Sequence, residues 1–533
     1  MVIKARVKRN TYFDSITLMK VARTLTSMDG VEDAAAIMAT EANLQLLAEA
    51  GLTPFEGNAG PADVLIVVRA NNEHNAEAAL QAAEEQLSQR PIATSIDDGN
   101  TGTHASRKQP HSLEQAVQLH PDARLAVISV PGPYAALEAD RALRAGLHVF
   151  LFSDNVPLAD EIALKRLARD RDLLLMGPDC GTAMFNGVAL GFVNVVPPGP
   201  IGIVGASGTG VQQVMSLIAR LGSGVSQVIG CGGRDLSEAV GAITTLQGLH
   251  LLQEDEQTEV IVLISKPPAP AVAERVLEMA VKGKKPVVVI FVGADYDALH
   301  SRYGDHIVVT RTLAEAARKA VSVCGGTDTM TGTWYVHDRK PVSSRNLKSP
   351  AQGNAAVASP VDARYISALF SGGTLCDEAM HIWAEQPGPI YSNIPLKPEW
   401  RLTPGQTKQG HMAIDFGADE YTRGRPHPMI DPVLRLQRLQ EEARNPRVGV
   451  ILLDIVLGYC SHPNPAEVYV PAILAARKQA SQEGRRLTFI ISLCGTEGDP
   501  QRLSIQAAKF REAGAEIFTS NADAASRCIE VLP

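Results

Sequence analysis

Short runs of β-branched and aliphatic residues recur along most of this 533-residue chain, and they constrain its fold more than any other feature. Each run is continuously apolar, ends in glycine or in a charged residue, and is followed by a stretch with helical spacing. Examples are HVFLF, IGIVG, QVIG, VIVLIS, VVVIF, SALF, MAID, VGVILLDIV and TFIISLC. Strands that are buried on both faces have this composition, and in alternation with helices they form parallel sheets. The sequence therefore predicts an α/β protein with doubly wound parallel sheets.

Two of the strand-to-helix turns resemble each other. Residues 201–215 read IGIVGASGTGVQQVM and residues 367–380 read SALFSGGTLCDEAM, and aligning Thr209 with Thr374 places Gly208 on Gly373. The first turn of such a helix leaves backbone N–H groups free, and the helix dipole adds partial positive charge. We therefore expect a phosphate-sized anion between two helix N-termini, unless the glycines only permit tight turns. The residues expected to bind it are Ser207, Gly208, Thr209, Gly210, Gly372, Gly373 and Thr374.

The chain is too long for one hydrophobic core, and its pattern divides it into several domains. Its first part alternates strands and helices as a small α+β unit does, and two polar stretches without apolar period are typical of linkers. The expected parts are an N-terminal α+β domain with its linker (1–112), a Rossmann-type domain (113–197), a flavodoxin-like domain (198–325), a linker (326–360) and a second flavodoxin-like domain (361–533).

Composition excludes several classes of function. The net charge is −8 and no basic stripe is present, which argues against nucleic acid as a partner. The seven cysteines are scattered and never form a CxxC pair, so we expect neither disulfides nor a zinc site. No apolar run approaches the ~18 residues of a membrane span. These features predict a cytoplasmic protein that does not bind membranes.

The segment YTRGRPHPMIDP supplies the densest group of candidate catalytic residues. Arg423, Arg425, His427 and Asp431 lie within nine residues of one another, and the flanking prolines keep His427 out of a helix. A histidine held between a guanidinium and a carboxylate suits general acid–base chemistry or anion binding. The alternative is a structural turn in which Asp431 caps the next helix. Lys266, directly after the run VIVLIS, could attract a phosphate.

Other polar residues follow predicted strands. Arg234 and Asp235 come after a Cys-Gly-Gly sequence, where Arg234 could bind a substrate carboxylate bidentately. An alternative to substrate binding, equally favoured by the sequence, is a structural role, in which the two residues form an ion pair as neighbours or Asp235 caps a helix. Cys180 in GPDCGT would need a base to act as a nucleophile, and none is visible. The acidic turn around Asp415 could suggest a divalent metal, but such turns are common and we expect none.

Several motifs carry a family resemblance. Residues 123–295 resemble the α subunit of succinyl-CoA synthetase through SVPGPY, GPDCGT, IGIVGASGTG, GCGGRDL and KPVVV, and residues 361–533 resemble the C-terminal domain of its β subunit. More narrowly, DSITLM, GASGTG, SKPP and YTRGRPHPMIDP identify the chain as a member of the FdrA family of acyl-CoA-synthetase-like proteins. The resemblance makes the Rossmann-type domain CoA-binding-like and the two flavodoxin-like domains α-type and β-type ligase domains.

The resemblance implies a role in allantoin and purine degradation, as one subunit of a hetero-oligomeric oxamate carbamoyltransferase. That enzyme transfers a carbamoyl group between oxalurate and phosphate, giving oxamate and carbamoyl phosphate. The catalytic residues would be His427, Lys266 and Arg425, and the substrate-binding residues Arg234, Asp235, Arg423 and Asp431.

An acyl-CoA synthetase is one alternative, and a non-catalytic scaffold that binds a phosphorylated metabolite is another. The chain lacks the Gly-His-Ala-Gly loop that carries phosphohistidine in succinyl-CoA synthetase, and it has Lys266 where that family has a carboxylate. No GxGxxG-like run falls in 1–30 or 113–130, so CoA is not an expected cofactor.

Overall fold

The computed structural model divides the chain into two compact units, residues 1–109 and 110–533. Both expected linkers lie almost entirely outside the residues that the structure describes. The described residues are 2–9, 11, 13, 15–26, 28–40, 43–44, 47–48, 51–53, 59–88, 110, 112–326, 365–384, 388–403, 406, 409–423 and 425–532. None of the helices within these ranges is long and apolar enough to cross a bilayer.

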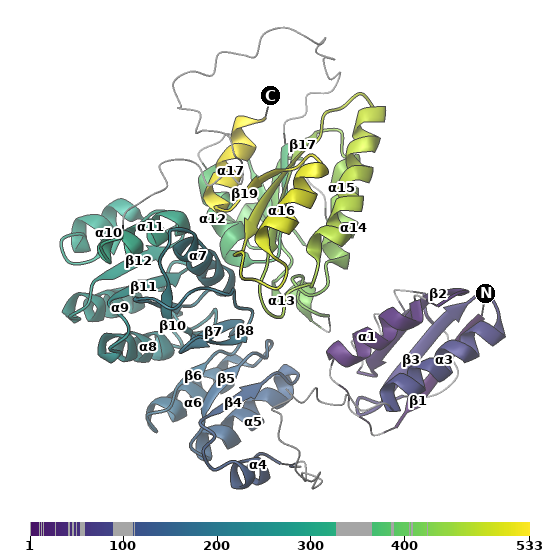
Figure 1. Cartoon of the computed structure of the whole chain (residues 1–533), viewed down its shortest axis with the longest axis horizontal. Helices are drawn as coiled ribbons and strands as arrows, with labels where there is room; N and C mark the ends of the chain where they lie inside the picture. Colours follow the sequence, from purple (N-terminus) through teal and green to yellow (C-terminus); the bar gives the residue numbers. More distant parts are fainter. Residues whose placement is uncertain are drawn as a thin grey trace. The chain divides into compact units, whose positions relative to one another are not determined.

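The N-terminal unit is a small α+β domain, as the sequence predicts. Its antiparallel sheet has the order β1-β3-β2, formed by β1 (Val2–Lys8), β2 (Val31–Met38) and β3 (Val64–Ala70). Helices α1 (Ser15–Thr26) and α3 (Glu73–Ser88) pack on this sheet, purple in Figure 1. The central strand β3 is almost wholly buried, since apolar residues on its two faces belong to two separate clusters.

The second unit begins with a small lobe around a three-stranded parallel sheet of order β4-β5-β6. Its strands are short and rich in aliphatic residues, which pack against the helices that follow them. The elements are α4 (Leu113–Leu119), β4 (Leu125–Ile128), α5 (Gly132–Arg144), β5 (His148–Leu151), α6 (Leu158–Arg169) and β6 (Leu175–Met176).

The next lobe contains a seven-stranded sheet of order β13-β12-β11-β9-β10-β7-β8. Five strands are parallel, and β7 joins them antiparallel to β10. The strands are β7 (Thr182–Phe185), β8 (Val188–Gly191), β9 (Ile201–Gly205), β10 (Val225–Gly230), β11 (Val260–Ser265), β12 (Val287–Phe291) and β13 (Val308–Val309). The helices are α7 (Gly208–Arg220), α8 (Ile243–Glu254), α9 (Pro270–Lys282), α10 (Tyr296–Tyr303) and α11 (Leu313–Val323).

The hairpin β7–β8 differs from the sequence expectation, which placed these residues in the domain ending at residue 197. Asn186 and Gly187 both have positive φ, and such a pair makes a tight turn between antiparallel strands. The hairpin then pairs with β10, so the sheet of this lobe begins before residue 198. The dipeptide Asn186-Gly187 is typical of such a turn, so the sequence itself could have indicated the hairpin.

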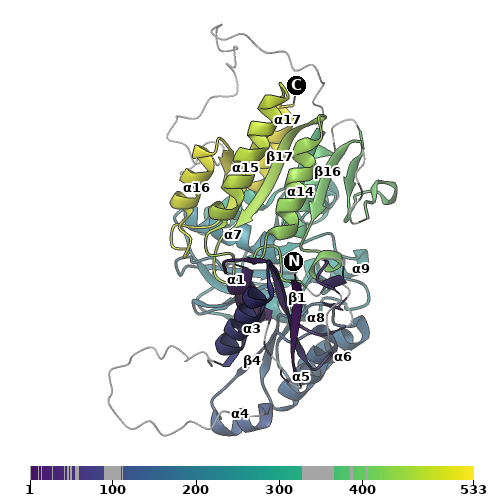
Figure 2. The same cartoon turned by 90° about the vertical axis from the view of Figure 1, so that its right-hand side faces the viewer.

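The C-terminal lobe has a six-stranded, all-parallel sheet of order β15-β16-β14-β17-β18-β19. Helices flank both faces of this sheet (Figure 2). The strands are β14 (Tyr365–Phe370), β15 (Ile390–Ser392), β16 (His411–Asp415), β17 (Val448–Val456), β18 (Thr488–Cys494) and β19 (Glu516–Phe518). The helices are α12 (Gly373–Trp383), η1 (Pro398–Trp400), α13 (Asp419–Thr422), α14 (Val433–Arg444), α15 (Pro465–Gln482), α16 (Leu503–Glu512) and α17 (Asn521–Glu530).

One continuous hydrophobic core joins the last two lobes. It contains buried residues of α7 and α11 together with buried residues of α12, β18 and α17. Polar side chains cross the same boundary: Gln213 Nε2 donates to the carbonyl of Thr519 at 2.8 Å, and Glu378 Oε1 accepts the N–H of Leu313 at 2.9 Å. The architecture confirms the predicted α/β class with parallel sheets.

Candidate functional site

The two strand-to-helix turns have the form that the sequence predicts. Helix α7 begins at Gly208 after β9, and helix α12 begins at Gly373 after β14. The aligned glycines are therefore equivalent first residues of two helices. Ser207 caps α7 through its hydroxyl, which accepts the N–H of Gly210 at 3.1 Å, whereas the equivalent Gly372 provides no side-chain cap.

The two helix N-termini contact each other directly. The Ser207 hydroxyl donates to Thr374 Oγ1 at 2.6 Å. A Cβ atom on Gly372 would fall 2.3 Å from Thr209 Oγ1, and one on Gly210 would fall 3.1 Å from Thr374 Cγ2. Glycine is therefore needed for this close approach. The sequence predicts an anion between the two helix N-termini. Because Ser207 and Thr374 are in direct contact, no ion fits between their hydroxyl groups. An anion that binds to both helices would have to lie to one side of this contact.

A buried ion pair holds the second turn from behind. Asp454, on β17, accepts the backbone N–H of Ser371 at 2.7 Å and the Ser371 hydroxyl at 3.0 Å. Arg435 donates to the same carboxylate at 2.8 Å and to the carbonyl of Leu369 at 2.7 Å. Burial raises the pKa of Asp454, and the charge of Arg435 opposes this effect. This pair orients the turn and leaves the first N–H groups of α12 as the free donors.

Lys266 and Asp415 meet at the first residue of α12. Lys266 follows the last residue of β11, and Asp415 is the last residue of β16. A Cβ atom on Gly373 would lie 3.3 Å from Lys266 Nζ and 2.6 Å from Asp415 Oδ2. Burial raises the pKa of Asp415 to about 6, while the Lys266 ammonium acts in the opposite direction. Lys266 thus brings a positive charge from one lobe to a helix end of the other.

His427 lies on the other side of Asp415. A Cβ atom on Gly417 would lie 3.0 Å from His427 Nε2 and 3.1 Å from Asp415 Oδ1. Nδ1 of His427 accepts the backbone N–H of Met429 at 3.3 Å, so in the neutral ring the proton is on Nε2. The ring also packs against Phe192, with 5.3 Å between ring centroids.

The electrostatics of His427 favour hydrogen-bond donation over proton transfer, the two roles that the sequence left open. Desolvation by the surrounding protein, followed by the positive charge of Arg435, lowers the pKa of His427 to about 4. The ring is therefore neutral near pH 7. With Nδ1 engaged by Met429, the imidazole can donate a hydrogen bond from Nε2 and has no free lone pair to accept a proton.

Two predicted substrate-binding carboxylates have structural roles. Asp235 is fully buried, where it binds Lys165 Nζ at 2.6 Å and accepts the N–H and hydroxyl of Thr245. Asp431 Oδ1 accepts the N–H of Val433 at 3.0 Å and so caps α14. Both residues thus follow the alternatives drawn from the sequence: both oxygens of Asp235 accept hydrogen bonds, and Oδ1 of Asp431 does so at the start of α14.

The predicted arginines are placed differently from one another. Arg234 pairs with Glu161 at 2.8 Å and donates to the carbonyl of Val156, although 45% of its side chain is exposed. Arg423 and Arg425 are both exposed. Their possible contacts with a substrate stay predictions.

The first lobe contributes carboxylates that were not among the expected site residues. Desolvation by the surrounding protein, then the charges of Asp154 and Asp419, raise the pKa of Asp179 to about 7, and Asp415 adds to the effect. Asp154 accepts the Thr422 hydroxyl at 3.1 Å, which ties this lobe to the C-terminal lobe. The neighbouring Cys180 is buried and its pKa is raised to about 12, which disfavours a thiolate nucleophile.

Three family models match parts of the chain. Residues 369–530 match a family described as CoA-ligase, residues 197–293 a CoA binding domain, and residues 1–104 a domain described as AllF, heavy metal-associated. None of the seven cysteines lies in residues 1–104, and the described part of the chain holds no group of three or more metal-ligating side chains that could bind a metal ion. The described residues of the N-terminal domain therefore do not form a metal site.

Similar proteins cover different shares of the chain. The uncharacterized protein YahF of Escherichia coli (strain K12) is 42% identical over 522 residues, which are 98% of this chain and 97% of YahF. The α 2 subunit of ADP-forming succinate–CoA ligase from Archaeoglobus fulgidus is 30% identical over 180 residues, 33% of this chain and 61% of that subunit. The solved apo dinucleotide forming acetyl-coenzyme A synthetase 1 of Ca. Korarchaeum cryptofilum matches 76% of this chain and 81% of its own, at 16% identity and a TM-score of 0.32.

Proposed function

Because this chain belongs to the same protein family as YahF, and carries CoA-ligase-like domains behind an AllF-type domain, we propose that it is a subunit of a carbamoyltransferase complex. The proposed reaction transfers a carbamoyl group between oxalurate, or a related ureido acid, and phosphate. A phosphate oxygen bonds to the ureido carbon, and the bond from that carbon to the oxamate nitrogen breaks. The products are carbamoyl phosphate and oxamate, whose nitrogen gains a proton.

The observation that carries this proposal is the convergence of three side chains on the N-terminus of α12. Lys266 and Asp415 lie against Gly373, and His427 lies against Gly417 beside Asp415. An ammonium, a carboxyl group with a pKa of about 6 and a neutral imidazole are the groups that this transfer requires.

Each group has a proposed task in the reaction. Lys266, with the free N–H groups at the start of α12, binds the phosphate. His427 donates from Nε2 to the carbonyl oxygen of the ureido group, which accumulates negative charge as phosphate attacks. Asp415, in its protonated form, gives the proton to the departing oxamate nitrogen and takes it back in the reverse direction.

The exposed arginines suit the carboxylate of the ureido acid. Arg423 and Arg425 lie four and two residues before His427, and a guanidinium can bind a carboxylate through two parallel hydrogen bonds. Arg234 is a third candidate, because its charge also acts on Asp179 near the same centre. We propose that one or more of these residues orient the substrate, with no cofactor needed.

The AllF-type match supports a place in allantoin degradation, with further subunits completing the enzyme. An acyl-CoA ligase is the second candidate, because two of the three family models describe CoA-ligase and CoA-binding domains. The two functions require different ligands, carbamoyl phosphate in one and CoA in the other.

Isothermal titration of the full chain distinguishes the two candidates. We expect heat of binding with carbamoyl phosphate and with inorganic phosphate, and none with CoA. Clear binding of CoA without binding of carbamoyl phosphate would reverse the order of the candidates. A second measurement follows carbamoyl phosphate formation from oxalurate and phosphate after the chain is combined with its partner subunits.

A further inference from the structure

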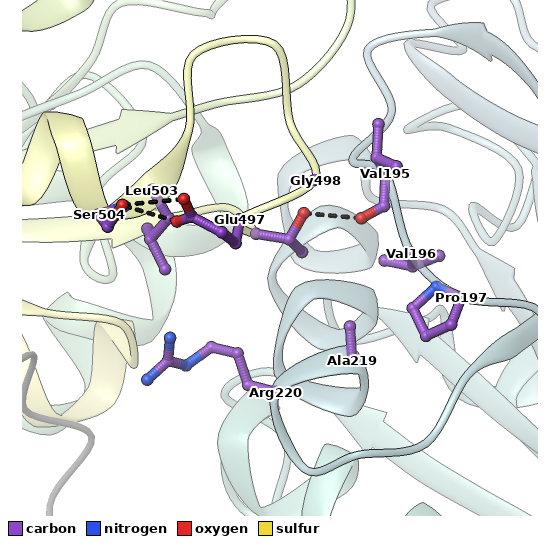
Figure 3. A pocket seen from close by; sticks show the side chains of 10 residues that line it. Val195, Val196, Pro197, Ala219, Arg220, Glu497, Gly498, Leu503 and Ser504 are labelled. Carbon is purple, nitrogen blue, oxygen red and sulfur yellow. Dashed lines mark hydrogen bonds between the residues drawn. The ribbon is translucent and has the colours of Figure 1, made fainter.

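A cavity lies away from the charged centre, between the seven-stranded lobe and the C-terminal lobe. Its volume is about 560 Å³, which is within the range of small-molecule sites. Figure 3 shows that three segments form its walls: the chain before β9, the end of α7 and the loop before α16. The lining residues that matter most are Val195, Val196, Pro197, Ala219, Arg220 and Leu503.

The walls of this cavity are held in place without a ligand. The backbone N–H of Val195 donates to Asp499 Oδ1 at 2.7 Å, and the carbonyl of Val195 accepts the Thr496 hydroxyl at 2.6 Å. Asp499 also accepts the side-chain amide of Asn194 at 2.9 Å. These bonds fix two of the three segments to each other, so the cavity is preformed.

Arg220 provides the positive charge of the cavity. Its side chain extends from the last turn of α7 along the cavity, and Figure 3 draws no hydrogen bond to it from the other lining residues. Within the described part of the chain, its buried Nε has no hydrogen-bond partner. Desolvation lowers the pKa of Arg220, which reflects the cost of this unpaired charge.

The carboxylate that lines the cavity does not neutralise Arg220. Glu497 accepts the backbone N–H and the hydroxyl of Ser504, both at 2.9 Å, and it also pairs with Arg502 at 3.4 Å. Its hydrogen-bonding capacity is therefore directed toward its own loop. The guanidinium of Arg220 extends toward the side of the cavity where Leu503 lies, and the aliphatic residues Val196 and Pro197 line the opposite side (Figure 3).

We propose that this cavity binds a small organic carboxylate with an apolar body. The carboxylate would pair with Arg220, whose guanidinium matches it in shape and charge. The apolar body would cover Val196, Pro197 and Leu503. A single cation in an apolar cavity matches one negative charge better than the two charges of a phosphate ester.

The cavity and the charged centre lie at opposite ends of one helix. Helix α7 begins at Gly208, beside the centre, and ends at Arg220, so the two places are separated by about 20 Å along the helix axis. This carboxylate site is therefore independent of the proposed transfer reaction, and its test does not use that activity.

The test measures binding to the full chain by isothermal titration, with hexanoate and benzoate as probes. Hexanamide, which lacks the charge, and inorganic phosphate, which lacks the apolar body, are the comparison ligands. We expect both carboxylates to bind and the two comparison ligands to bind at least about tenfold more weakly. Equal binding of hexanamide, or no binding of either carboxylate, overturns the proposal.

A pair of variants assigns the site. Arg220→Met keeps the length and apolar character of the side chain, and it should weaken carboxylate binding about tenfold or more while the melting temperature is retained or raised. Arg486→Met, at an exposed arginine outside the cavity, is the matched control and should bind the probes as the unaltered chain does. If the two variants bind the carboxylates equally well, the site is not at Arg220 and the proposal is wrong.

Discussion

The hydroxyl of Ser207 donates a hydrogen bond to the hydroxyl of Thr374, across a distance of 2.6 Å. These residues belong to equivalent turns of two lobes, so a single bond joins the starts of α7 and α12. The bond fixes the relative position of two helix ends, and beside them stand Lys266, Asp415 and His427. The predictions below test the contact and the centre next to it.

The contact itself is tested with Thr374→Val, which removes the hydroxyl and keeps the shape. We expect a loss of about 1 kcal/mol in the free energy of unfolding, the usual contribution of such a bond. Ser207→Ala should cost more, because it also removes the cap on Gly210. Denaturant unfolding of both single variants and the double variant measures the coupling, and strictly additive effects would contradict a direct bond.

The two aligned glycines should respond differently to alanine. In Gly373→Ala the new methyl group would collide with Asp415 Oδ2 and press on Lys266, so phosphate affinity should fall about tenfold. In Gly208→Ala the nearest atom would be Thr182 Oγ1 at 3.6 Å, an ordinary contact, and binding should be unchanged. Titration with phosphate separates the variants. Equal affinities in both would place the anion elsewhere.

The charge of Lys266 should be needed for anion binding rather than for folding. Lys266→Met removes the ammonium, and we expect at least about tenfold weaker binding of carbamoyl phosphate with little change in melting temperature. Lys282→Met is the control, because the side chain of Lys282 is 75% exposed on α9. A Lys266→Met chain that still binds carbamoyl phosphate normally would remove this residue from the site.

The pH profile of the reconstituted reaction should follow Asp415 and not His427. With a pKa of about 6, Asp415 loses its proton as pH rises, so the rate from oxalurate should fall through pH 6 and the reverse rate should rise. His427, with a pKa of about 4, stays neutral over this range. Asp415→Asn should abolish the pH dependence of both the forward and the reverse rate. His427→Gln should lower both rates and leave the midpoint of their pH dependence near pH 6. A shifted midpoint in His427→Gln would assign the titration to His427.

Stability should also depend on pH through Glu378. This carboxyl is 2% exposed, and burial raises its pKa from 4.5 to about 7. Since the folded state then holds the proton more tightly than the unfolded state, stability is highest below pH 4.5 for this group and is lost as pH rises to about 7. At about 1.4 kcal/mol per pKa unit, the loss over this range is roughly 3 to 4 kcal/mol.

Glu378→Gln should flatten this part of the stability profile. Urea unfolding at pH 5 and pH 7.5 measures the difference between the two conditions for each variant. Glu441→Gln, at an exposed position of α14, is the control and should keep the profile of the unaltered chain. An unchanged slope in Glu378→Gln would show that other groups control it.

Local sequence patterns were sufficient for most of the parallel strands and for the two turns, but not for the sheet to which the hairpin β7–β8 belongs. Apolar runs fixed the strands, and the alignment of Gly208 with Gly373 gave the first residues of α7 and α12 because helix starts are set by local backbone chemistry. The position of Lys266 at the end of β11 also follows from the sequence, but its place beside the turn of the other lobe depends on how the two lobes pack.

Contacts with residues elsewhere in the chain determine the roles of the candidate residues that the sequence left undecided. Asp235 is a structural residue because Lys165, 70 residues earlier, reaches it in the core. The state of His427 depends first on the burial of its ring and then on the charge of Arg435, and the N–H of Met429 fixes its tautomer; none of these can be read from composition. The sequence could only present such residues as candidates, since it does not show which partner satisfies them.

The shared hydrophobic core of the last two lobes has a consequence for how the chain could be cut. Covalent continuity between α11 and β14 is not required to keep these lobes together, because α7, α11, α12 and α17 bury one another's apolar faces. Polypeptides 1–326 and 365–533, made from separate genes in one cell, should therefore copurify as an obligate pair, while each made alone should aggregate.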